Sequence, residues 1–175
     1  MQENKTLQTV YTFFLGLLLA IFIGVGISTF YPAPKMPEYP ISLNTYGKEM
    51  TAEQEAAQRQ WDVEFEQYND KQKPYNRNVA IISLAGAVVL LVISILQEKR
   101  IKFISDGVML GGLFTLIYGI GRSFASEDSR SIFIMVSAGL LVVLYLGYHR
   151  FVRPQAALTV AKKNTVKKPS KTIKK

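Results

Sequence analysis

Four long apolar stretches constrain this 175-residue chain more than any other feature. An α-helix rises 1.5 Å per residue and the hydrocarbon core of a bilayer is about 30 Å thick, so roughly 20 apolar residues make one crossing. The four stretches have about this length, and they cover residues 7–31, 78–97, 103–121 and 131–149. The sequence therefore predicts an all-α integral membrane protein, a four-helix bundle formed by residues 1–153.

Lys and Arg in the short flanks of these spans indicate the orientation of the chain. The connection after the second span holds Lys99, Arg100 and Lys102, and the end of the fourth span holds Arg150 and Arg153. Because short loops rich in Lys and Arg stay in the cytosol, both places are expected there, and four crossings put both termini on that side. These five side chains are also predicted to contact anionic lipid headgroups.

Residues 32–77, between the first and second spans, are then expected outside the membrane on the far side. Prolines recur every two or three residues from Pro32 to Pro40, which predicts an extended segment. Such a segment is either a stiff spacer or a ligand for an aromatic groove in another protein.

A helix is expected within this exterior segment, from about residue 51 to residue 70. Thr51 and Gln54 have the spacing of a capping box, in which each side chain accepts a hydrogen bond from the other residue's amide. Pro74 is expected to separate this helix from the second span, because proline disrupts helical hydrogen bonding.

One face of the exterior helix is apolar and includes the single tryptophan of the chain. Ala57, Trp61, Phe65 and Tyr68 recur at spacings of four, four and three on an otherwise charged helix. In one interpretation this stripe packs across the outer ends of the spans or rests at the lipid interface. In the other it binds a protein partner. For the second interpretation, Trp61, Phe65 and Tyr68 are the predicted binding residues, since exposed aromatic patches are costly without a partner.

Small residues predict where helices approach each other closely. In the first and third spans they recur at intervals of four, which allows close packing in a membrane; these positions are Gly16, Ala20, Gly24, Ser28, Gly107 and Gly111. The first and third spans are therefore expected to pack tightly, either within one molecule or between copies in a homo-oligomer.

Residues 154–175 carry seven lysines and no acid, and they contain little apolar material to bury. This composition predicts a disordered cytosolic tail that associates with anionic lipid. Nucleic acid is a further potential partner of the tail but is not favoured, because no aromatic residue is interleaved to stack on bases.

Residues that could support catalysis are sparse. The chain has no cysteine, which excludes disulfides and thiolate chemistry, and its one histidine, His149, lies at the predicted end of the fourth span. Asp106 lies in the first turn of the third span and Arg122 directly follows the span, and at both a structural role is expected, with an ion or proton site as the alternative. We expect no catalytic, cofactor or metal site, and hence no enzyme.

Two families of four-span proteins, the tetraspanins and the claudins, are excluded because their defining cysteines are absent. Residues 11–34, YTFFLGLLLAIFIGVGISTFYPAP, resemble the first span of uncharacterised membrane proteins of small-genome bacteria, which implies a bacterial cytoplasmic membrane but no function. Retention of the first span as an anchor is expected, with cleavage as a signal peptide as the alternative.

The function expected from these features is that of a scaffold or accessory subunit, which presents an exterior helix and a cationic tail. Two alternatives stay open at this stage. One is a small oligomeric transporter or channel component, and the other is a membrane tether for nucleic acid or ribosomes.

Overall fold

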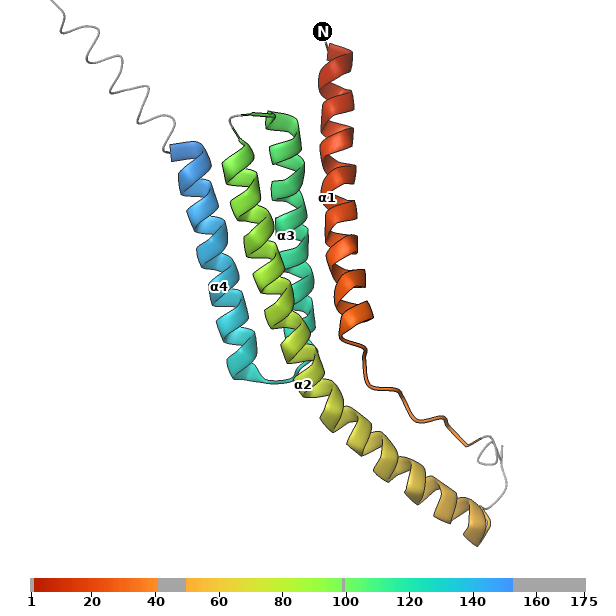
Figure 1. Cartoon of the computed structure of the whole chain (residues 1–175). Coiled ribbons are helices and arrows are strands. Elements are labelled where there is room, and N and C mark those ends of the chain that lie inside the picture. Colours follow the sequence, from red (N-terminus) through yellow and green to blue (C-terminus); the bar gives the residue numbers. More distant parts are fainter. Residues whose placement is uncertain (1, 41–49, 99, 153–175) are drawn as a thin grey trace, which may run out of the picture. The chain divides into compact units, whose positions relative to one another are not determined.

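The computed structural model describes residues 2–40, 50–98 and 100–152, and these residues form four α-helices without any strand. In chain order the helices are α1 (Gln2–Phe30), α2 (Ala52–Gln97), α3 (Lys102–Phe124) and α4 (Ser129–Gly147), followed by a short π-helical segment, η2 (Tyr148–Val152) (Figure 1). All four α-helices are long and apolar enough to cross a membrane. The all-α prediction is confirmed for the described residues, and the four candidate spans suggest a multi-pass membrane protein.

The chain divides into two compact units, residues 1–136 and residues 137–175. Within the first unit, α3 packs against both α1 and α2, whereas α1 and α2 contact each other little. The central helix of this group is therefore α3. Helix α4 crosses the boundary between the two units, so the packing of all four helices in one bundle stays a prediction.

Large apolar side chains are exposed on every α-helix. Phe22 of α1, Leu96 of α2 and Ile117 of α3 expose 74%, 74% and 64% of their surface, and Leu141 of α4 exposes 67%. Exposed apolar surface of this extent is unfavourable in water but not in hydrocarbon. The outer surfaces of the helices thus fit a lipid environment, as their lengths do.

Helix α2 differs from the sequence prediction, because Pro74 does not separate two helices. The helix runs from Ala52 to Gln97 with Pro74 inside it. Proline lacks the amide hydrogen that would bond to the carbonyl of Asp70, and its ring crowds that carbonyl, so it bends a helix whose two halves are held in place. Both residues are exposed, and Figure 1 shows α2 bending between its yellow N-terminal part and its green C-terminal part.

The beginning of α2 agrees with the capping box predicted from the sequence. The Thr51 amide donates to Gln54 Oε1 at 3.0 Å, and the Gln54 amide donates to Thr51 Oγ1 at 3.4 Å. Glu53 and Glu55 lie in the first turn, where their charge complements the positive end of the helix dipole. The hydrogen bonds between Thr51 and Gln54 therefore determine where the helix begins.

Helices α2 and α3 pack through small side chains. Five buried positions of α3 recur at alternating intervals of three and four, the spacing of coiled-coil packing: Ser105, Val108, Gly112, Thr115 and Gly119. A Cβ atom on Gly112 would lie 2.7 Å from Leu91 Cδ2, and one on Gly119 would lie 3.0 Å from Ser83 Cβ. A larger residue at either position would require its neighbours on α2 to shift, so glycine favours the observed approach of the two helices.

Candidate functional site

Four aromatic residues form a continuous row along the N-terminal part of α2. The Tyr39 ring meets the Trp61 ring edge-on at a centroid distance of 5.1 Å, and Trp61 stacks on Phe65 at 4.8 Å. Tyr68 follows Phe65 at 6.1 Å. We call Tyr39, Trp61, Phe65 and Tyr68 the aromatic ladder. Ring pairs of this kind contribute about 0.5–1.5 kcal/mol each beyond the area they bury, so the ladder is a preformed surface.

The proline-rich segment lies against the same part of α2. Between them is a cleft of about 360 Å³, lined by Pro34, Lys35, Pro37, Glu64, Gln67, Tyr68 and Lys71. The three ladder residues on α2 are half-buried, whereas Tyr39 and Met36 of the segment expose 51% and 60% of their surface. The apolar stripe is thus partly covered by this chain's own proline-rich segment, an arrangement that neither interpretation of the sequence included.

Aromatic and polar contacts brace α2 where it passes the end of α1. The Tyr31 ring stacks on Tyr75 with centroids 5.2 Å apart, and Asn78 donates its side-chain amide to Tyr31 Oη at 2.9 Å. The guanidinium carbon of Arg122, near the end of α3, lies 5.2 Å from the centroid of Tyr75. A cation over a ring at this distance adds about 0.5–1 kcal/mol. Tyr75 is buried and connects all three helices of the first unit.

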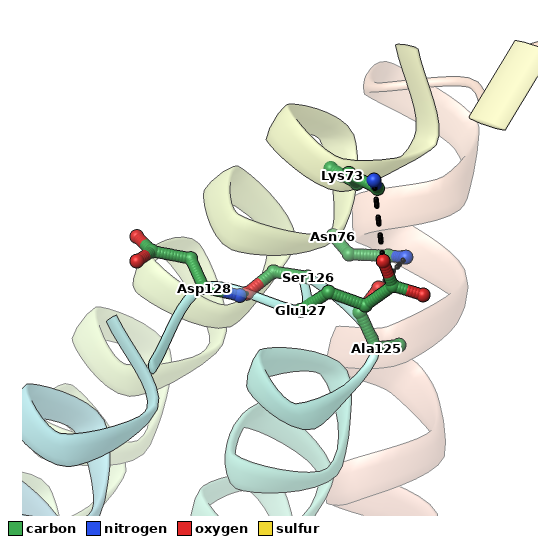
Figure 2. A network of polar contacts seen from close by, with 6 residues as sticks. All are labelled: Lys73, Asn76, Ala125, Ser126, Glu127 and Asp128. Atoms are coloured by element: carbon green, nitrogen blue, oxygen red, sulfur yellow. Dashed lines mark hydrogen bonds and ion pairs between the residues drawn. The ribbon is translucent and has the colours of Figure 1, made fainter. Parts of the chain in front are cut away.

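The turn between α3 and α4 supports α2 on both sides of Pro74 (Figure 2). Asn76 donates its side-chain amide to the Ala125 carbonyl oxygen at 2.8 Å, and Lys73 Nζ lies 3.2 Å from Glu127 Oε2. Glu127 has a φ of 55°, in the left-handed region that a tight turn requires. The exposed ion pair contributes little by itself. Together these contacts hold the residues next to the proline and explain why α2 continues through it.

Asp128 begins α4 by capping its first turn. Its carboxylate accepts hydrogen bonds from the Arg130 amide at 3.2 Å and from the Ser131 hydroxyl. The Ser131 hydrogen bond, with further help from the backbone amides, lowers the pKa of Asp128 below its ordinary value of 3.8. The sequence analysis did not identify this cap, although Asp is a preferred residue at that position.

The predicted ridge of small residues on α1 contacts α3 along the first half of α1. A Cβ atom on Gly16 would lie 2.9 Å from Leu110 Cβ and 3.1 Å from the Gly107 carbonyl oxygen. Conversely, a Cβ atom on Gly107 would lie 2.7 Å from Leu15 Cδ2. On Gly111 it would lie 2.9 Å from Leu19 Cβ. These glycines bring the two helices together within one molecule.

The second half of the ridge is not part of this contact. A Cβ atom on Gly24 would meet nothing within 4 Å and Ser28 is exposed, whereas Ala20, between Gly16 and Gly24, is half-buried. The Ser28 hydroxyl donates to the Val25 carbonyl oxygen of its own helix at 2.9 Å. The interval of four therefore continues in the sequence beyond the place where α1 and α3 approach closely.

A reciprocal serine pair between α2 and α3 was not found by the sequence analysis. Ser94 Oγ donates to the Ser105 carbonyl oxygen, and Ser105 Oγ donates to the Ser94 carbonyl oxygen, both at 2.8 Å. A signal was present, because Ser83, Ala87 and Ser94 are small residues at intervals of four and seven, as expected for a packed helix face. Interhelical hydrogen bonds of this type stabilise membrane helices by about 0.6 kcal/mol each.

The neighbouring ends of α1 and α3 form a cleft that we call the lysine cleft. It has a volume of about 480 Å³ and is lined by Lys5, Gln8, Thr9, Thr12, Lys102, Phe103 and Asp106. The Thr12 hydroxyl donates to the Phe103 carbonyl oxygen at 3.3 Å, and the Tyr11 and Phe103 rings meet edge-on at 5.8 Å. These contacts connect the two helix ends and place Lys5 beside a residue predicted to contact lipid, Lys102.

The other predicted residues are spread over the chain. Arg100 is exposed between α2 and α3, and Arg150 lies in η2 together with His149, whose ring is 6.2 Å from Tyr145. Lys99, Arg153 and the tail, residues 154–175, lie outside the described residues. Within the described part of the chain, no group of three or more His, Cys, Asp or Glu residues is arranged to hold a metal ion.

The described side chains offer an aromatic surface, hydrogen-bonded helix contacts and a lysine-lined cleft. Comparisons with protein-family models, with curated proteins and with solved structures found no match. The function is therefore argued from the geometry of the chain itself.

Proposed function

We propose that this protein is a non-enzymatic membrane scaffold or accessory subunit that presents the aromatic ladder to a protein partner. The observation that carries the proposal is the continuity of α2 through Pro74. A helix of 46 residues is about 69 Å long, roughly twice the thickness of the hydrocarbon core. About half of α2 therefore extends beyond the membrane as one arm.

The arm is held at its base, as presentation of a surface requires. Tyr75, Asn76 and Asn78 contact α1, α3 and the turn after α3 through rings and hydrogen bonds. A flexible linker at Pro74 would let the ladder reorient freely, and each encounter with a partner would then cost conformational entropy. A braced helix removes most of that cost.

The distribution of Lys and Arg along the chain favours a position of this arm outside a bacterial cytoplasmic membrane. The Lys and Arg residues at the connection after α2 and at the end of η2 favour the cytosol for both termini. In this topology the ladder faces the exterior, and the lysine-rich tail lies in the cytosol near anionic lipid.

The ladder has the chemistry of a protein-binding surface. Tyr and Trp are enriched among the residues that dominate binding energy, and charged side chains at the rim of such a patch exclude water from it. Trp61 and Tyr68 are half-buried and held by their neighbours, whereas Tyr39 is exposed and available. A partner would complete the burial of a surface whose side chains are already ordered.

Two buried hydroxyl groups, on Ser83 of α2 and Thr115 of α3, favour a scaffold over an oligomeric transporter. Ser83 donates to the Val79 carbonyl oxygen at 2.7 Å, and Thr115 donates to the Gly111 carbonyl oxygen at 2.8 Å. A permeation path needs polar groups that can bind the permeant species, whereas these hydroxyl groups satisfy backbone carbonyls within their own helices.

Co-purification after gentle detergent extraction, with chemical crosslinking, tests the proposal. The variant W61A/F65A removes the centre of the ladder, and Q60A/V63A is the matched control on another face of the same helix. Loss of two central aromatic anchors should weaken partner binding by about 30-fold or more, which corresponds to about 2 kcal/mol. Recovery of the wild-type protein alone as a monomer, or an equal loss in both variants, would contradict the proposal.

A further inference from the structure

The lysine cleft lies where the headgroups of a bilayer would be. The apolar run of α1 starts at Leu7 and that of α3 at Phe103, and each run is preceded within two residues by a lysine that lines the cleft. Lysines at the ends of membrane helices reach toward the phosphate layer. We propose that this cleft binds the phosphodiester headgroup of an anionic glycerophospholipid of the phosphatidylglycerol type. The inference requires membrane insertion but not the scaffold function.

The charge of the cleft matches one phosphodiester. Lys5 and Lys102 contribute two positive charges and Asp106 one negative charge, which leaves a sum of +1. A phosphodiester carries one negative charge and neutralises this sum. A phosphate monoester, at about −1.5 to −2, would leave excess negative charge beside the Asp106 carboxylate. A choline headgroup would add a quaternary ammonium that needs an aromatic cage rather than two lysines.

The remaining polar residues suit a headgroup that carries hydroxyl groups. Gln8 supplies both an amide donor and a carbonyl acceptor, and the Asp106 carboxylate supplies acceptors only. The Thr9 hydroxyl already donates its hydrogen to the Lys5 carbonyl oxygen at 3.0 Å, so this group can serve a ligand only as an acceptor. Glycerol hydroxyl groups are donors that fit this set, and the volume of about 480 Å³ lies in the range of small-molecule sites.

The wall of the cleft is suited to the glycerol backbone and the upper acyl chains. Phe103 lines the cleft and the Tyr11 ring meets it edge-on, and the two residues expose 39% and 47% of their surface. Aromatic side chains at this depth contact the boundary between headgroups and hydrocarbon. A lipid bound here would contact α1 and α3 at once and would stabilise their packing.

Native mass spectrometry of the full-length protein in detergent provides the test. Delipidated protein is titrated with phosphatidylglycerol and with phosphatidylcholine of the same acyl chains. The wild type should retain one phosphatidylglycerol at least 10-fold more tightly than phosphatidylcholine. The variant K5Q/K102Q should lose this preference, whereas K35Q/K71Q, which removes the same charge from another cleft, should keep it.

Two further measurements complete the test. One distinguishes binding of the lipid from binding of free phosphate, and the other distinguishes loss of binding from misfolding. Inorganic phosphate at millimolar concentration should not displace the lipid, and the charge-preserving variant K5R/K102R should restore binding. Displacement by phosphate would show a general anion site and would overturn the proposal. An equal loss of lipid binding in K35Q/K71Q would also overturn the proposal. So would a wild-type protein that binds phosphatidylglycerol and phosphatidylcholine equally well, and this comparison does not depend on any variant.

Discussion

At the scale of single residues, Gly16 permits a close approach of α1 to α3. An alanine there would bring its Cβ atom to 2.9 Å from Leu110 Cβ and 3.1 Å from the Gly107 carbonyl oxygen, so a helix backbone must move. Overpacking of this kind costs about 1–3 kcal/mol. We predict that G16A lowers the free energy of unfolding by this amount, measured by titrating sodium dodecyl sulfate into mixed micelles and following circular dichroism.

Gly24 provides the control for that prediction. A Cβ atom there would meet nothing within 4 Å, and alanine favours a helix over glycine by up to about 1 kcal/mol. G24A should leave the stability unchanged or raise it slightly. Equal destabilisation by G16A and G24A would mean that the contact between α1 and α3 is absent in micelles.

A second residue-scale prediction concerns the pH dependence of the Asp128 cap. The hydrogen bond from Ser131 keeps the pKa of Asp128 below 3.8, so the folded state favours the ionised carboxylate. The stabilisation by the cap is therefore complete above pH 3.8 and is lost as the pH falls through the lower pKa of the folded state. Hydrogen exchange of the Arg130 amide, corrected for its intrinsic rate, should lose protection in that acidic range.

The variant D128N distinguishes the carboxylate from other acid effects. Asparagine also accepts hydrogen bonds at a helix start but does not titrate in this range. Its exchange protection at Arg130 should stay constant where that of the wild type falls. An identical acid response in both proteins would assign the effect to another group.

At the scale of elements, the bend in α2 is attributable to Pro74. Alanine at this position supplies an amide hydrogen for the Asp70 carbonyl and removes the clash with the ring, so P74A should straighten the helix. The chain has no cysteine, and spin labels on Q60C and I93C would therefore report one defined distance. In a straight helix these 33 residues span about 50 Å.

Double electron–electron resonance in detergent should show a longer distance between the two spin labels in P74A than in the protein with Pro74. The same pair of labels with N69A, a substitution that leaves the proline in place, serves as the reference. An unchanged distance in P74A would mean that the braces at Tyr75 and Asn76, rather than the proline ring, determine the bend.

Elements defined by short-range chemistry were predictable from the sequence. The four candidate spans follow from apolar length alone, and the start of α2 follows from Thr51 and Gln54, which are three residues apart and bond to each other. Neither feature depends on distant parts of the chain. The continuation through Pro74 was predicted wrongly, because contacts with Ala125 and Glu127, about 50 residues away, outweigh the local preference of proline.

Features that depend on which helices become neighbours were predicted only in part. Gly16 and Gly24 look equivalent in the sequence, but only at Gly16 would an added Cβ atom meet another helix within 4 Å. The aromatic stripe on α2 was visible as a periodicity, whereas its contact with Tyr39 joins Trp61 to a residue of the proline-rich segment 22 positions earlier. Periodicity identifies the face of a helix and leaves open what covers that face.

At the scale of the whole molecule, the proposed roles depend on the direction in which the four spans cross the membrane. The aromatic ladder and the lysine cleft lie at opposite ends of the α1–α3 pair, since one adjoins the segment after α1 and the other adjoins the start of α1. In the proposed topology of four crossings with cytosolic termini, the ladder faces the exterior and the cleft faces the inner leaflet. Reversal of the topology would exchange these two environments.

Single cysteines in this cysteine-free chain decide between the two orientations. Asn69, near the base of the arm, is the exterior site, and Ser170, in the lysine-rich tail, is the interior site. In intact cells a membrane-impermeant maleimide should label N69C fully and S170C only after permeabilisation, because the Lys and Arg residues of the short connections resist translocation. Labelling of S170C in intact cells, with protection of N69C, would move the ladder to the cytosol and rule out an exterior partner.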